Sequence, residues 1–124
     1  MITEDYVSFE TAKLLKEKGF ECTTLHYYDE DGDLLFSAWR VDTGKNEFVA
    51  PTLQMVMKWL REKYGLHCSV IFHLHNDWEP CILEFHNDKV PKNYLTSCDT
   101  YEKACEAAIK YCLENLISNE TDIR

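Results

Sequence analysis

The sequence lacks most of the features that mark common enzyme and membrane classes. It has only four glycines and contains no phosphate-binding glycine loop, no GxSxG motif and no HExxH motif. No apolar run approaches the roughly 20 residues that a membrane-spanning helix needs. The N-terminal stretch "MITEDYVSFETAKLL" carries Glu4 and Asp5 where a secretory signal would carry Lys or Arg. These absences predict a cytoplasmic protein that is not an enzyme and needs no cofactor.

Positive charge is also in the minority. Lys and Arg number 13 and Asp and Glu number 22, which gives a formal net charge of -9. Direct binding to nucleic acid or to an anionic membrane requires a positive field, so we expect neither. An acidic surface can instead dock on a basic partner. One hypothesis is therefore an inhibitor that imitates nucleic acid and occupies a host nucleic-acid-binding protein, although lysines interleave the acids along the chain.

The six cysteines include no CxxC pair. Because the expected compartment is reducing, we predict that most of them fill core positions and do not form disulfides. Cys105 and Cys112 lie seven residues apart, which is the spacing of core positions on one helix face. Cys98 precedes a predicted helix and is the best candidate for a nucleophile, but no other feature supports that chemistry.

The length and composition predict one packed domain. The chain has 124 residues, of which 45% are hydrophobic and 13% aromatic. These values fit a globular protein with a real core and argue against global disorder. We place the domain at residues 1–117 and a polar tail at 118–124.

Three segments have helical periodicity, each with one apolar face. The first, "SFETAKLLKEKG", has Ser8 as a predicted N-cap and Gly19 as its stop. The second, "PTLQMVMKWLREKYG", starts at Pro51 and ends before Gly65. The third, "TYEKACEAAIKYCLENLI", has Thr100 or Asp99 as its cap.

The first segment between helices predicts an antiparallel hairpin. Strands at 20–28 and 34–41 flank an acidic turn, in which Asp31-Gly32 suits a type I′ bend, and a short third strand is expected at 47–49. The turn sequence "DEDGD" does not match a calcium-binding EF-hand loop, because Gly32 occupies position 4 and a strand follows. An acidic hairpin turn is the expected structure.

The stretch "VIFHLHNDWEPCILEFH", residues 70–86, predicts a second hairpin with a two-residue loop at Asn76-Asp77. In that register Phe72 faces Cys81 and one face of the hairpin is apolar. A three-residue loop would pair apolar with polar residues, so the pattern disfavours it. The resulting order is α-β-β-(β)-α-β-β-α. It predicts an α+β fold with one antiparallel sheet of four to five strands and three helices packed mainly on one face.

The other face of this predicted hairpin carries the candidate metal ligands. His67 would lie across from His86, with Glu84 on the diagonal, and facing Cβ atoms would be about 5 Å apart. Two imidazoles and a carboxylate could hold zinc, although a structural zinc site usually has four ligands. The alternative is a solvated or partner-facing strand surface.

The same face also carries a candidate interaction patch. Trp78 lies beside the turn, and Ile71 and Ile82 are placed near it with His73 and His75 around them. An uncovered apolar patch of this kind is typical of a surface that binds another protein. The alternative is that another strand or a helix covers it.

Four segments resemble a family of small phage- or prophage-type proteins of unknown function from Bacteroides-like gut bacteria. They are "VSFETAKLLKEKGF", "DEDGD", "APTLQMVMKWLREKYG" and "TYEKACEAAIKYCLE". The resemblance covers most of residues 1–117, is most specific at 51–65 and 101–113, and departs most in the central hairpin. It implies a phage or mobile-element accessory setting and no site residues. We therefore expect a non-enzymatic accessory protein that binds a protein partner or itself; the alternatives are the nucleic-acid mimic and a metal-binding protein using His67 and His86.

Overall fold

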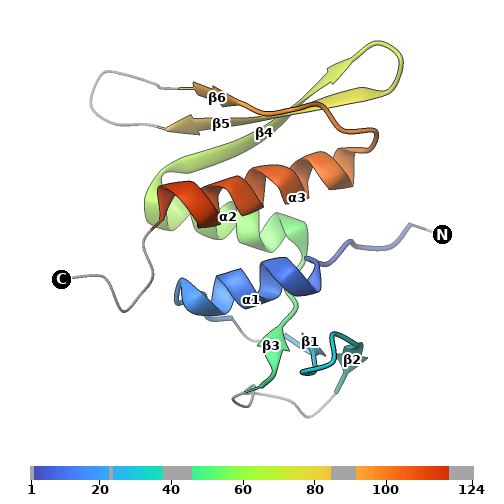
Figure 1. Ribbon diagram of the computed structural model, residues 1–124, viewed down its shortest axis with the longest axis vertical. Helices are drawn as coiled ribbons and strands as arrows, with labels where there is room; N and C mark the ends of the chain where they lie inside the picture. The colour runs from blue at the N-terminus through green and yellow to red at the C-terminus, as the bar shows by residue number, and fades with distance from the viewer. Residues whose placement is uncertain (1, 23, 38–45, 85–91, 118–124) are drawn as a thin grey trace. The chain divides into compact units, whose positions relative to one another are not determined.

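The structure is a computed structural model that describes residues 2–22, 24–37, 46–84 and 92–117 (Figure 1). It confirms an α+β protein, and the helices and strands predicted from the sequence occur in the predicted order. A sixth strand before the last helix is additional, and residues Cys112–Leu116 of the predicted third helix form a π-helical turn. The elements are α1 (Phe9–Glu17), β1 (His26–Tyr28), β2 (Leu34–Phe36), β3 (Phe48–Val49), α2 (Leu53–Tyr64), β4 (Leu66–His73), β5 (Asp77–Glu84), β6 (Lys92–Tyr94), α3 (Tyr101–Tyr111) and η1 (Cys112–Leu116).

The described strands form two antiparallel sheets of three strands each, so the prediction of one sheet of four to five strands is wrong. Their orders are β2-β1-β3 and β4-β5-β6. Each predicted hairpin recruits its own third strand, β3 beside β1 and β6 beside β5, and so completes a separate sheet. The chain divides into two compact units, Met1–Thr52 with Leu113–Arg124 and Leu53–Cys112. One domain spanning 1–117 stays a prediction, and the predicted tail 118–124 lies outside the described residues.

In the first unit, α1 begins where the sequence predicted. The Ser8 side-chain oxygen accepts a hydrogen bond from the Thr11 backbone N–H at 3.2 Å, which is the expected N-cap interaction. The helix buries Ala12 and Leu15, which are both 0% exposed. Its end is closed by the Phe20 N–H, which donates to the Leu15 carbonyl at 3.0 Å.

The first hairpin is shorter than predicted. Phe20 closes α1 and so lies outside the strand predicted at 20–28, of which β1 retains only His26–Tyr28. β1 pairs with β2 from His26↔Phe36 to Tyr28↔Leu34, which confirms the hairpin itself. Part of the second predicted strand, residues 38–41, lies outside the described residues.

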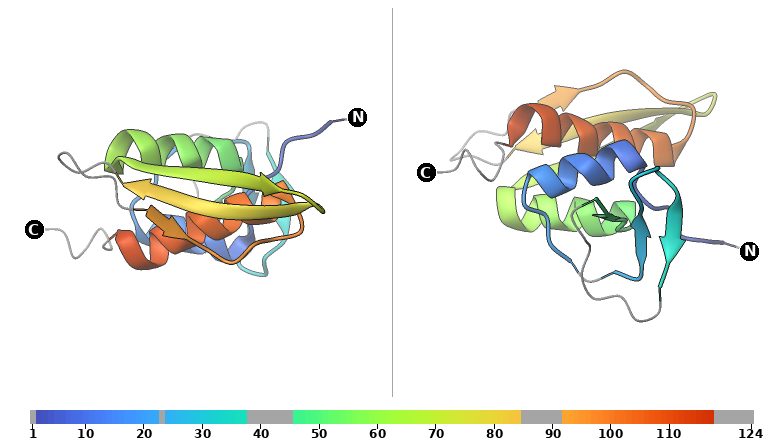
Figure 2. Two further views of the ribbon diagram at one scale, coloured as in Figure 1. Left: turned by 90° about the horizontal axis from the view of Figure 1, so that it is seen from above. Right: turned by 60° about the horizontal axis from the view of Figure 1, so that its bottom comes forward.

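The second unit is a three-stranded sheet with α2 and α3 packed on one side of it (Figures 1 and 2). In α3, the Thr100 side chain caps the helix by accepting from the Lys103 N–H at 3.1 Å. No helix among the described residues has the combination of length and apolar character needed to cross a bilayer. The buried faces of the two helices consist of Leu53, Val56, Met57 and Leu60 in α2 and of Ala104, Cys105, Ala108 and Ile109 in α3.

The register of the second hairpin differs from the prediction. β4 and β5 pair from Leu66↔Glu84 to His73↔Asp77, which leaves a three-residue loop and contradicts the two-residue loop. In the loop, His75 has φ 72° and Asn76 has φ 60°, a left-handed conformation in which His and Asn are enriched among non-glycine residues.

The burial of β5 shows why alternation misled the register prediction. Cys81 and Ile82 are adjacent in sequence and project to opposite faces, yet they are only 3% and 0% exposed. β5 is the central strand of its sheet, so neighbouring strands flank its side chains, and the small Cys81 is buried even on the face away from the helices. The adjacent apolar pair Cys81 and Ile82 therefore interrupts the polar alternation that would fix the register.

A candidate interaction surface at the hairpin tip

The β4–β5 hairpin is longer than the helices that cover it. Each strand has eight residues, or about 26 Å at 3.3 Å per residue. α2 has 12 residues, and α3 with its continuation η1 has 16, which correspond to about 18 Å and at most about 24 Å. In Figure 1 the hairpin loop extends past the N-terminal end of α3, and the view from above in Figure 2 agrees. Residues near the loop therefore lack a helix beneath them.

The uncovered end of the hairpin carries large apolar side chains. Phe72 and Trp78 are directly opposite in the sheet, and their ring centroids lie 4.5 Å apart. Trp78 in turn meets the Tyr101 ring edge-on at 5.7 Å. Phe72 is 52% exposed and Leu74, at the start of the loop, is 80% exposed. These four residues, Phe72, Leu74, Trp78 and Tyr101, are called the hairpin-tip cluster below.

Backbone pairing holds the cluster in place. The Trp78 N–H donates to the Cys98 carbonyl at 2.9 Å, and the Cys98 N–H donates to the Trp78 carbonyl at 2.8 Å. The Gln54 side-chain amide donates to the Tyr101 hydroxyl oxygen at 3.3 Å. A hydrogen bond with Cys105 is the main cause of the raised pKa of Tyr101. The segment before α3 thus fixes Trp78, and α2 and α3 fix Tyr101, so these two aromatic residues of the cluster are held in place.

The structure separates the residues of the predicted interaction patch. Ile71 and His73 lie on the face of the sheet away from the helices, where the His73 ring bonds the Glu79 carboxylate at 2.9 Å. Trp78 and Ile82 lie on the helix-facing side, and Ile82 is completely buried. His75 is exposed in the loop. The predicted single patch of these five residues is therefore wrong, because it was built on the wrong register.

The same register change separates the candidate metal ligands. His67 pairs with Leu83 and Glu84 pairs with Leu66, so His67 and Glu84 project from opposite faces of the strand pair. Their predicted diagonal contact is wrong. His86 lies outside the described residues, so its role as a ligand stays a prediction.

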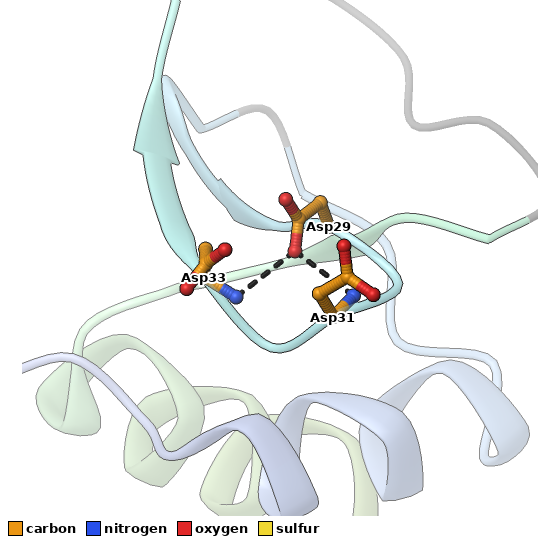
Figure 3. Close-up of side chains that lie close together, drawn as sticks. All are labelled: Asp29, Asp31 and Asp33. Carbon is orange, nitrogen blue, oxygen red and sulfur yellow. Dashed lines mark hydrogen bonds between the residues drawn. The ribbon is translucent and has the colours of Figure 1, made fainter.

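Within the part of the chain that the structure describes, only Asp29, Asp31 and Asp33 bring three potential metal ligands within 4.8 Å of one another (Figure 3). They occupy the five-residue turn between β1 and β2, which is longer than the predicted type I′ bend. One carboxylate oxygen of Asp29 accepts from the Asp31 N–H at 3.0 Å and the Asp33 N–H at 2.9 Å. These bonds to its own turn explain why an aspartate occupies position 29 without any ion.

A second exposed apolar group lies in the first unit. β2 is an edge strand of its sheet, and Leu34, Leu35 and Phe36 are 44%, 39% and 59% exposed. Residues 38–45 directly follow this strand and lie outside the described residues. Phe36 in this group is about as exposed as Phe72, so it provides a comparison for the hairpin-tip cluster.

The sequence interpretation missed Phe72 and Leu74, since it assigned them to the buried face of the hairpin. Their residue types did not indicate that they are exposed, because Phe and Leu are typical core residues. The lengths of the helices predicted from the sequence gave no signal either, because the predicted third helix is as long as the strands.

No family model, no curated protein and no solved structure matches the chain. The resemblance to small phage- or prophage-type proteins of Bacteroides-like bacteria stays a prediction.

Proposed function

We propose that this protein is a non-enzymatic accessory protein that binds a protein partner through the hairpin-tip cluster. The observation that supports the proposal is the 52% exposure of Phe72, whose ring lies against Trp78, together with the 80% exposure of Leu74 at the start of the adjoining loop. Fully burying one such apolar side chain contributes roughly 1.5–3 kcal/mol. Aromatic anchors near the centre of a patch are typical of the residues that dominate protein–protein binding energy.

The surroundings of the cluster also suit a protein partner. β4 is an edge strand in its sheet, and its sequence LHCSVIFH contains none of the Lys or Pro residues that protect exposed edges. A partner that packs on the cluster can therefore also pair with this edge.

The acidic-mimic alternative has less support from the described charges. α2 carries Lys58, Arg61 and Lys63, and in α3 Lys103 lies 3.0 Å from Asp99. A mimic needs carboxylates aligned at the spacing of a nucleic-acid backbone, and interleaved lysines oppose that field. The cytoplasmic location and the phage or mobile-element setting stay predictions that accompany the proposal.

The proposal is tested with two matched variants of the full chain. Phe72→Ser combined with Leu74→Ser removes the exposed part of the hairpin-tip cluster, and Phe36→Ser removes a similarly exposed ring from β2. Sedimentation equilibrium measures self-association of each protein. In quantitative affinity capture, wild type and the two variants are then used as separate baits. The amount of partner protein that each bait binds is compared. We expect wild type and Phe36→Ser to form the same complex, and the double variant to lose at least about tenfold in affinity.

Two results would contradict the proposal. One is a complex that the double variant forms as tightly as wild type while circular dichroism shows that all three proteins are folded. The other is a complex that only Phe36→Ser weakens, because that result would place the interface on β2.

A further inference from the structure

Two cysteine sulfurs meet between the sheet and the end of α3 in the second unit. The Sγ atoms of Cys68 in β4 and Cys112 after α3 lie 3.8 Å apart, although the residues are 44 positions apart in sequence. Cys112 is completely buried and Cys68 is half-buried. The pair thus joins a residue that solvent partly reaches to one that solvent does not reach.

We propose that Cys68 and Cys112 form a modification site, at which a low-molecular-weight disulfide such as glutathione disulfide converts the two thiols to an intramolecular disulfide. A disulfide has sulfurs about 2.05 Å apart, so the sulfurs must approach by less than 2 Å from the observed 3.8 Å. Residue spacing along the sequence does not indicate this pair, since the contact arises only when β4 and α3 pack together. The inference is independent of the hairpin-tip cluster and of the proposed function.

The reaction has two exchange steps that balance. The Cys68 thiolate attacks glutathione disulfide, forms a mixed disulfide and releases one glutathione thiolate. The Cys112 thiol then attacks the Cys68 sulfur and passes its proton to the departing glutathione thiolate, which breaks the mixed disulfide and releases the second glutathione. Two protein thiols are oxidised, and one glutathione disulfide is reduced to two glutathione thiols.

The environments of the two thiols determine which one reacts first. A hydrogen bond with Cys68, followed by burial, raises the pKa of Cys112, so Cys112 stays protonated and reacts second. The neighbouring Cys105 is the competing partner for Cys68. Burial is the main cause that raises the pKa of Cys105 to about 11, and this thiol also interacts with the Tyr101 hydroxyl.

Peptide mapping distinguishes the possible pairs. Trypsin places Cys68 and Cys81 in peptide 64–89, Cys98 in 93–103, Cys105 in 104–110 and Cys112 in 111–124. The reduced full-length protein is incubated with glutathione disulfide under native conditions, free thiols are blocked with N-ethylmaleimide, and the digest is examined by mass spectrometry without reduction. The Cys81→Ala variant ensures that any link to peptide 64–89 is made by Cys68.

We expect peptides 64–89 and 111–124 to be linked in wild type, in Cys81→Ala and in the matched control Cys105→Ala, and the link to be absent in Cys68→Ala and Cys112→Ala. The oxidised wild type should also unfold at a midpoint about 5 °C or more above the reduced form, because the bond closes a long loop in the unfolded chain. The half-buried Cys68 makes Cys68→Ala the informative variant if Cys112→Ala does not fold.

Three outcomes would overturn the inference. The first is a fully reduced protein in excess glutathione disulfide. The second is a glutathione adduct on Cys68 that does not proceed to a link. The third is a link from Cys68 to peptide 93–103 or 104–110 in place of 111–124.

Discussion

At the scale of single residues, Gly32 has the conformation that most restricts substitution in the acidic turn. Its φ of 86° lies in the left-handed region, and a Cβ atom added there would lie 3.1 Å from the Phe9 ring. Phe9 in turn contacts the rings of Tyr28 and Phe48 at 5.6 Å and 5.7 Å between centroids. One glycine therefore serves both the turn and the aromatic packing of α1 against the first sheet.

We predict that Gly32→Ala lowers the free energy of unfolding by about 1–2 kcal/mol, because alanine is strained in the left-handed region. Urea unfolding followed by circular dichroism measures the change. Gly32→Asn is the matched control, since asparagine tolerates this conformation and adds the same Cβ. Equal losses for both variants would show that the Phe9 contact sets the cost, and no loss for Gly32→Ala would contradict the prediction.

At the scale of elements, the register of the second hairpin decides which isoleucine supports the core. The predicted register placed Ile71 and Ile82 on the same uncovered face. In the structure Ile82 pairs with Cys68 on the helix-facing side and is completely buried, while Ile71 pairs with Glu79 on the other side and is 38% exposed. Ile82 therefore contributes more to the stability of the core than Ile71 does.

We predict that Ile82→Ala destabilises the protein by about 2–5 kcal/mol, as expected when a buried side chain is truncated and a cavity remains. Ile71→Ala is the matched control and should cost less than about 1 kcal/mol, because solvent already reaches this side chain. Thermal and urea unfolding of both variants provide the comparison. Similar losses for the two variants would favour the two-residue loop over the observed register.

At the scale of the whole molecule, net charge and exposed apolar groups act together on solubility. The formal charge at pH 7 is -9 and the pI calculated from the sequence is about 4.9. Repulsion between like-charged molecules therefore weakens as the pH falls towards that value. The exposed side chains of Phe36, Phe72 and Leu74 are then free to associate between molecules.

We predict a solubility minimum near pH 5 that deepens at higher protein concentration. Light scattering across a pH series measures it, with circular dichroism to show that the protein is still folded. Phe72→Ser combined with Leu74→Ser should make the minimum shallower. An unchanged minimum in that variant would indicate that the hairpin tip does not drive the association.

Local patterns predicted the helices well. Ser8 and Thr100 cap α1 and α3 as expected, and Gly65 follows α2 as predicted. These signals act within a few residues, so the sequence alone contains them. The α+β class followed from the alternation of such segments.

The features that the sequence did not predict depend on contacts between distant segments. Residue alternation could not fix the register of β5, because as a central strand it buries both Cys81 and Ile82. β3 pairs with β1 and β6 pairs with β5, so the two strands belong to different sheets. These pairings depend on tertiary packing, and no local sequence pattern predicts them. The predicted patch and the predicted diagonal contact between His67 and Glu84 both depended on the register of the second hairpin, so the same register error affected both, while the role of His86 stays a prediction.

By itself, therefore, the sequence determined where the helices begin and end, the acidic balance and the existence of two hairpins, because capping, periodicity and charge are local or additive properties. Only the tertiary structure decided which strands share a sheet, which face of the hairpin the helices cover, and that Phe72 and Leu74 lie beyond that cover. It also decided that Cys68 meets Cys112. These outcomes depend on the relative lengths and the packing of elements that are far apart in the chain.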